Sequence, residues 1–166
     1  MSRPKAPAVR DCRPCTACCD GWVRITVAGH EARPGSPCPH STGAGCDDYA
    51  NRPLDPCVQF VCGWRIDASP LPEWMKPNEA RVIVLFGKTQ WQGLPVDLAV
   101  AVGLKVPPRA LQWLKAFAQR QGRPLLYTEQ VRVAGGLTGE QTVYGFGPPA
   151  FQEQAARWNA DGTSWW

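Results

Sequence analysis

The sequence predicts an α+β fold in which a small, loop-rich cysteine segment packs on a small mixed or antiparallel sheet with two helices. Three observations lead to this class. All eight cysteines lie within residues 12–62, and the 17 prolines and 16 glycines favour turns over a helical bundle. After this segment the hydrophobic pattern alternates between strand-like and helix-like stretches. The chain of 166 residues has the length of one ordinary domain.

We expect three parts within the single domain formed by residues 1–166. Residues 1–10 contain prolines and basic residues without any hydrophobic period, which is typical of a disordered arm. Residues 11–64 form the cysteine-cluster, metal-binding segment, and residues 65–166 form an α+β scaffold.

Apolar runs bounded by turn-forming residues predict the strands. A short one leaves the first cysteines, and the last two form a hairpin around the Gly135–Gly136 turn region. The predicted strands cover residues 22–27, 81–86, 94–102, 125–133 and 141–146.

Two later stretches have the helical period. Residues 109–121 follow Pro107 and Pro108, present one apolar face and end at Gly122. A last helix covers about residues 149–159. The apolar end formed by Trp165 and Trp166 is expected to dock on the protein or to contact a partner.

The cysteines have the spacing of metal ligands. The first four form a C-x2-C-x2-C-C run, in which residues three apart on a tight turn converge on one point. Cys19 should point away from Cys18; it could serve a second metal, complete the first site or pack in the core. We expect all eight thiols to be metal ligands, namely Cys12, Cys15, Cys18, Cys19, Cys38, Cys46, Cys57 and Cys62.

A second pattern, C-x2-Y-x2-R-P-x3-C-x2-F-x-C, runs from Cys46 to Cys62. Together the two patterns resemble the YkgJ-type cysteine-cluster family, whose members are described as zinc- or iron-chelating proteins. The resemblance covers roughly residues 10–65 and implies metal binding. It extends beyond Trp64 only in general layout, and it implies nothing about a reaction or a substrate.

Tyr49 and Arg52 lie between cysteines in the second pattern. A guanidinium there can donate hydrogen bonds to thiolate sulfurs or hold loop carbonyls, so we expect both residues to support the ligands rather than to bind the metal. His40 could ligate a metal, but it is expected to contact a ligand or solvent. His30 is expected to lie in an exposed loop at the end of the first strand.

The spacing does not decide between zinc and iron. Structural zinc sites usually draw two ligands from each of two C-x2-C turns, whereas three cysteines at C-x2-C-x2-C are typical of a loop around a 4Fe–4S cluster. Bacterial ferredoxins also have a later cysteine followed by proline, but Cys19 is followed by Asp20. The sequence therefore leaves open whether the metal is zinc or iron and whether there are one or two centres.

The formal net charge of +4 counts every cysteine as neutral. Eight thiolates would subtract eight charges and two divalent ions would add four, which brings the sum to zero. We therefore expect no nucleic-acid partner and leave a protein partner open. Several arginines could offset the thiolates as well as meet phosphates: Arg10, Arg13, Arg24, Arg33, Arg52 and Arg65.

The remaining patterns bear on location and function class. No apolar signal region precedes the cysteines, and no apolar run could span a bilayer. We therefore expect a cytoplasmic protein without a membrane partner. Thiols stay reduced in the cytoplasm, which favours metal binding over disulfides. Residues 65–166 contain no phosphate loop and no evident catalytic set, so no catalytic residue is assigned.

Two functions agree with these patterns. The first is a metal-binding protein of undefined role, and the alternative is an iron–sulfur redox or electron-transfer protein or oxidoreductase component. Thiol–disulfide exchange through Cys12 and Cys15 is disfavoured, because no thioredoxin-like βαβ pattern surrounds them.

Overall fold

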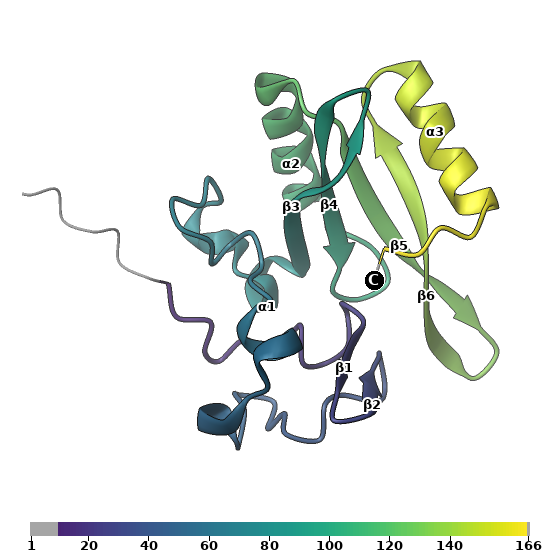
Figure 1. Cartoon of the computed structure of the whole chain (residues 1–166). Helices are drawn as coiled ribbons and strands as arrows, with labels where there is room; N and C mark the ends of the chain where they lie inside the picture. The colour runs from purple at the N-terminus through teal and green to yellow at the C-terminus, as the bar shows by residue number, and fades with distance from the viewer. Residues whose placement is uncertain (1–9, 166) are drawn as a thin grey trace, which may run out of the picture.

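The computed structural model describes residues 10–165, and a four-stranded mixed sheet forms its centre (Figure 1). Strands β3 (Val82–Trp91) and β4 (Leu94–Ala101) are antiparallel. Strand β5 (Leu125–Val133) runs parallel to β4, and β6 (Gly136–Phe146) is antiparallel to β5. Together with the helices, this sheet confirms the predicted α+β class.

Two helices complete the scaffold close to their predicted bounds. Helix α2 (Pro108–Gln121) makes the crossover that the parallel strands β4 and β5 require. It ends at Gly122, whose positive φ of 61° is easily reached by glycine. Helix α3 (Pro149–Ala160) follows β6. No helix within residues 10–165 is long and apolar enough to cross a lipid bilayer.

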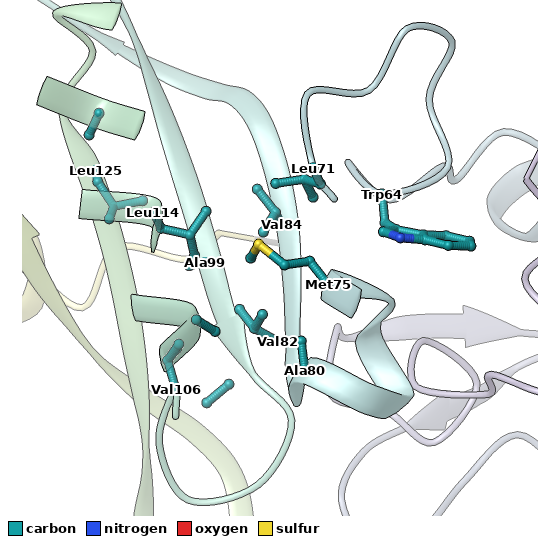
Figure 2. Close-up of a cluster of buried hydrophobic side chains, with 13 residues drawn as sticks. Trp64, Leu71, Met75, Ala80, Val82, Val84, Ala99, Val106, Leu114 and Leu125 are labelled. Atoms are coloured by element: carbon teal, nitrogen blue, oxygen red, sulfur yellow. The ribbon is translucent and has the colours of Figure 1, made fainter. Parts of the chain in front are cut away.

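The two helices cover opposite faces of the sheet, as Figure 1 shows. Val82 and Val84 of β3 pack in one cluster with Leu114 of α2, while the intervening Ile83 packs in another with Phe151 of α3. Alternate side chains of a strand point to opposite faces, so both faces are buried. Figure 2 shows the cluster on the α2 side.

The cysteine segment lies at one end of the sheet and contains little regular structure (Figure 1). Its only strand pair among the described residues is β1–β2, and short helical turns lie in the loops that follow. These small elements are β1 (Ile25–Val27), β2 (His30–Ala32), η1 (Tyr49–Asn51), η2 (Leu54–Val58), η3 (Glu73–Met75) and α1 (Pro77–Ala80).

The strand predicted over residues 22–27 is shorter than expected, because its partner β2 pairs only with Ile25–Val27. His30 was expected in an exposed loop; it instead pairs with Val27 in β2 and lies half-buried. Its Nε2 atom lies 2.9 Å from the Pro37 carbonyl oxygen. The loop expectation was therefore wrong for this residue.

Strand β3 continues five residues beyond its predicted end, to Trp91. The extension pairs with β4 through a two-residue turn at Gln92 and Gly93, whose φ angles of 50° and 77° match the twist of a tight hairpin. Strand β6 likewise begins before its predicted start, because local pairing continues to the Gly136 turn. Trp165 docks edge-on against Trp158 with ring centroids 5.3 Å apart, whereas Trp166 lies outside the described residues.

A buried carboxylate connects three strands of the sheet. Asp97 of β4 is 2% exposed and accepts a hydrogen bond of 2.8 Å from the Gly87 N–H, at the irregularity in β3. It also pairs with Arg123, just before β5, through Nε at 3.0 Å and through the terminal nitrogen Nη2. The pair therefore holds the β3 irregularity and the start of β5 in place.

Replacing Asp97 by Asn should lower the free energy of unfolding by about 3 kcal/mol, because Arg123 would lose its charged partner. The loss falls at the low end of the range for buried pairs, since the Arg123 side chain is 28% exposed. Urea unfolding measures the change. The exposed Asp67→Asn variant is the control, with an expected change within about 0.5 kcal/mol. Equal stability of the two variants would contradict a stabilising role for the pair.

Candidate metal centre

A single cavity of about 460 Å³ brings the cysteines together. Its wall is formed by the cysteine segment and by a few residues that precede or belong to the sheet, including Pro77 and Ile83. All eight cysteines are free thiols. The cavity is lined by every one of them: Cys12, Cys15, Cys18, Cys19, Cys38, Cys46, Cys57 and Cys62.

The first cysteines enter the cavity on a tight turn, as the spacing predicts. The Cys15 N–H donates to the Cys12 carbonyl at 2.6 Å, and the Gly21 N–H donates to the Cys18 carbonyl at 3.2 Å. Gly21 is required here, since a Cβ at this position would lie 2.2 Å from the backbone nitrogen of Arg33. The turn is thus closed against the end of β2.

Cys62 enters from the opposite end of the segment, and the residue after it lies directly on the sheet. The Gly63 N–H donates to the Val84 carbonyl of β3 at 2.6 Å. A Cβ on Gly63 would lie 2.7 Å from that oxygen, so no larger residue fits. Gly63 was not predicted as a functional residue; its signal in the sequence is a glycine between the last cysteine and a tryptophan.

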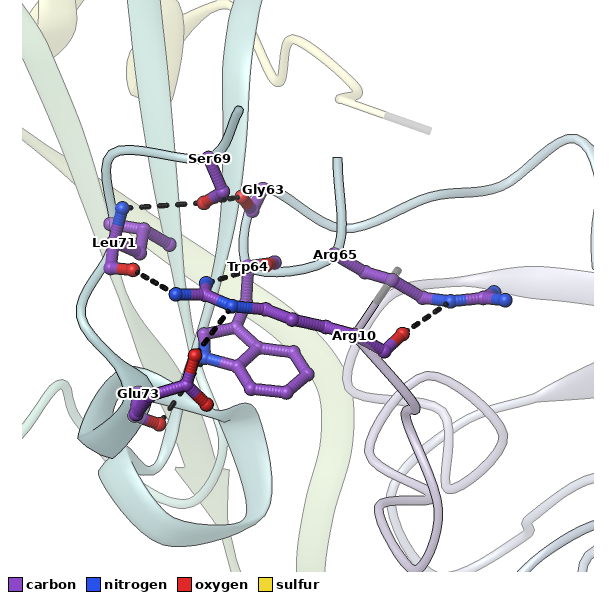
Figure 3. A network of polar contacts seen from close by, with 7 residues as sticks. All are labelled: Arg10, Gly63, Trp64, Arg65, Ser69, Leu71 and Glu73. Carbon is purple, nitrogen blue, oxygen red and sulfur yellow. Dashed lines mark hydrogen bonds and ion pairs between the residues drawn. The ribbon is translucent and has the colours of Figure 1, made fainter. Parts of the chain in front are cut away.

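Arg10 fixes the chain two residues before Cys12 (Figure 3). Its guanidinium donates to the carbonyls of Trp64 at 2.8 Å and Leu71 at 2.7 Å, and it pairs with Glu73 at 2.9 Å. The same group lies 4.7 Å from the centroid of the Trp64 ring. The Arg65 Nε in turn donates to the Arg10 carbonyl at 3.3 Å.

These contacts change the expected role of Arg10. The predicted arm covers residues 1–10; residues 1–9 lie outside the described residues, and Arg10 itself is anchored. Because Arg10 donates hydrogen bonds to the carbonyls of Trp64 and Leu71, it holds the start of the cysteine segment beside the end of that segment. No local pattern reveals this, since the partners are more than fifty residues away.

The thiols nearest the sheet have raised pKa values. Burial raises the pKa of Cys15, an effect that backbone N–H donors from Ala17 and Asn78 partly offset. Burial also raises the pKa of Cys62, which is partly offset by the N–H groups of Arg65 and Trp64. Such N–H donors to sulfur are the contacts that stabilise metal-bound thiolates.

Cys18 and Cys19 form a hydrogen-bonded pair with their sulfurs 3.9 Å apart. The bond with Cys19 raises the pKa of Cys18 well above its ordinary value, and burial adds to this. The same bond lowers the pKa of Cys19 to about 7, and the charge of Arg52 contributes to this lowering. The contact therefore shifts the two neighbouring thiols in opposite directions.

The other cysteines gather around Cys19 through the loop contacts. The Cys38 N–H donates to the Cys19 carbonyl at 2.8 Å, and the bridge between Ser41 and Cys46 returns the chain toward Cys38. Burial raises the pKa of Cys57, and the neighbouring charges of Cys19, Cys38 and Cys46 raise it further. The thiols of Cys19, Cys38 and Cys46 therefore lie close enough to Cys57 to act on it.

Arg52 and Tyr49 line the cavity beside this second set of thiols. The Arg52 guanidinium carbon lies 3.6 Å from the centroid of the Tyr49 ring, and its Nε donates to the Tyr49 carbonyl at 3.0 Å. Held in this way, Arg52 contributes to the lowered pKa of Cys19 and offsets part of the raised pKa of Cys57. His40 also lines the cavity, and its Nδ1 atom lies 2.8 Å from an Asp47 carboxylate oxygen.

The donor chemistry of this cavity fits a thiol-binding metal such as zinc or iron, but the side chains are not closed around a point. Among residues 10–165, no three Cys, His, Asp or Glu side chains converge closely enough to hold a metal ion as they stand. A bound metal would have to draw the thiols inward. No family model, no curated protein and no solved structure matches this chain, so the resemblance to the cysteine-cluster family stays a prediction.

In metal-free protein, Cys19 should be the cysteine most readily alkylated by iodoacetamide near neutral pH, because the thiolate is the reactive form. Its rate should reach half of its maximum at a pH of about 7, whereas Cys57, with a raised pKa, should need more alkaline solution. Peptide mapping by mass spectrometry over a pH series measures both residues in one sample.

The Arg52→Gln variant is the control for this assignment. Loss of the positive charge should move the Cys19 midpoint to higher pH, since Arg52 contributes to the lowered pKa. Cys19 reacting no faster than Cys57 in the unmodified protein would contradict the arrangement.

Proposed function

We propose that this protein binds zinc or iron through clustered cysteine thiolates, with a 4Fe–4S cluster as one form that the iron could take. The observation that carries the proposal is that eight free thiols from distant positions in the chain line one cavity. Clustered thiols are strong ligands for both metals, whose binding removes the thiol protons. The metal would hold loops that contain little regular structure of their own.

A second candidate is an iron–sulfur protein that carries electrons or serves an oxidoreductase. Two features favour it: backbone N–H groups donate to the sulfurs of Cys15 and Cys62, and the rings of Phe60 and Trp64 line the cavity. Hydrogen bonds to sulfur and exclusion of water both tune the reduction potential of such clusters.

We also propose that the chain belongs to the YkgJ-type cysteine-cluster family. The non-cysteine residues of the pattern support this, because they line the same cavity as the thiols: Tyr49, Arg52, Pro53 and Phe60. A role in the cytoplasm agrees with eight unpaired thiols, since disulfides are rare there.

The natural partner would be a protein rather than a nucleic acid. Metal-bound thiolates cancel the basic excess, and the stretch around Cys57 exposes the apolar side chains of Leu54, Val58 and Val61. Exposed apolar side chains favour contact with another protein over contact with phosphates.

Protein purified without oxygen should contain stoichiometric metal and show far fewer than eight titratable thiols until it is denatured. Metal analysis combined with thiol titration tests this. A brown protein that changes colour with dithionite would indicate an iron–sulfur centre, and a colourless zinc protein would exclude the redox candidate. A folded, metal-free protein with eight freely titrating thiols would contradict the proposal.

Arg52→Ala should leave the metal bound but speed its transfer to a chelator by about 10-fold or more, because an arginine beside thiolate ligands stabilises their charge. The matched control is Arg109→Ala, which removes an arginine 4.0 Å from the Trp74 ring and outside the cavity wall. Equal transfer rates for both variants would show that Arg52 does not support the site.

A further inference from the structure

We propose that the eight cysteines form two adjoining metal sites of four thiolates each. The inner site consists of Cys12, Cys15, Cys18 and Cys62, and the outer site consists of Cys19, Cys38, Cys46 and Cys57. This division rests on the metal-binding function proposed above and specifies how its ligands are shared.

Packing separates the two sets. Cys15, Cys18 and Cys62 pack against the large core cluster that contains Ile83 and other residues of the sheet. Cys38 instead forms a small separate cluster with Val27 and Ala32, against which Cys19 and Cys57 pack. The adjacent cysteines at positions 18 and 19 therefore belong to different hydrophobic environments.

The neighbours of each thiol give the same division. Cys15 is influenced by the charges of Cys12 and Cys62, and Cys18 by those of Cys15 and Cys62 in addition to its bonded neighbour. In the other set, the thiolates that act on Cys57 are Cys19, Cys38 and Cys46. The two sets meet where the sulfurs of Cys18 and Cys19 lie 3.9 Å apart.

Ligand number and charge agree with this division. A closed structural zinc site takes four ligands, so eight cysteines complete two such sites with none left over. Four thiolates around one divalent ion leave two negative charges, which each site can offset with its own groups. The inner sulfurs accept backbone N–H groups, whereas Arg52 lies beside the outer ones.

The two sites differ in their attachment to the scaffold. The inner one is tied to β3 through Gly63 and to the 64–73 loop through Arg10. The outer site lies among loops in which β1 and β2 form the only strand pair within the described residues. Loss of the outer metal should therefore leave the sheet folded, while loss of the inner metal should weaken the contact between the segment and the sheet.

Zinc and cobalt, each added alone to metal-free full-length protein, test the division. Metal is counted after exposure to a competing chelator that removes weakly held ions, and cobalt absorption reports thiolate coordination. We expect two ions in the unmodified protein and one in each single variant Cys62→Ser or Cys57→Ser.

Double variants decide the grouping. Cys46→Ser/Cys57→Ser and Cys12→Ser/Cys62→Ser, each within one proposed site, should still retain one ion, whereas Cys57→Ser/Cys62→Ser, across the sites, should retain none. Because inner variants could also unfold, circular dichroism is recorded for all of them, and the outer double variant should keep both the sheet signal and one ion.

The failures of the two proposals are distinguishable. Unmodified protein that binds neither zinc nor cobalt, and that also contains no iron when purified without oxygen, would overturn metal binding itself. Binding of a number of ions other than two, or loss of all metal from the folded outer double variant, would overturn the division and leave metal binding standing.

Discussion

The contact between Gly63 and β3 is the constraint on which the cysteine segment depends. One backbone hydrogen bond of 2.6 Å to Val84 joins the segment to the sheet, and a Cβ at Gly63 would lie 2.8 Å from the Phe86 ring. The approach is possible only because glycine has no side chain. It places Cys62 at the edge of the core and directs the next residue, Trp64, into the cluster shown in Figure 2.

The Arg10 contacts close the other end of the segment against the same place. Since Arg10 donates to the carbonyl of Trp64, the residues before Cys12 and after Cys62 lie side by side (Figure 3). Closing both ends removes much of the entropy of the intervening loops, which have only one small hydrophobic cluster apart from their contacts with the sheet. Metal binding by the thiols would supply the ordering that short strands and turns cannot.

The arginines near the cysteines divide into groups with different tasks. Arg13 pairs with Asp11 at 2.7 Å and Arg24 with Glu31 at 3.0 Å, so these two guanidinium groups have carboxylate partners of their own. The charge of Arg52 contributes to the lowered pKa of Cys19 and offsets part of the raised pKa of Cys57, and the charge of Arg65 offsets part of the raised pKa of Cys62. On metal binding, the thiolate charge would therefore be balanced locally, by a few placed groups and backbone N–H donors.

The sequence by itself determined the elements whose signals are local: α2 with its Gly122 end, α3, the β5–β6 hairpin and the cysteine spacing, because periodicity and turn residues act over a few positions. Only the tertiary structure decided where β1 begins and β3 ends, how Arg10 and Gly63 join the segment to the sheet, and which cysteines become neighbours. Strand ends depend on the partner strand, and the Arg10 contacts join residues more than fifty positions apart, so no local pattern carries that information.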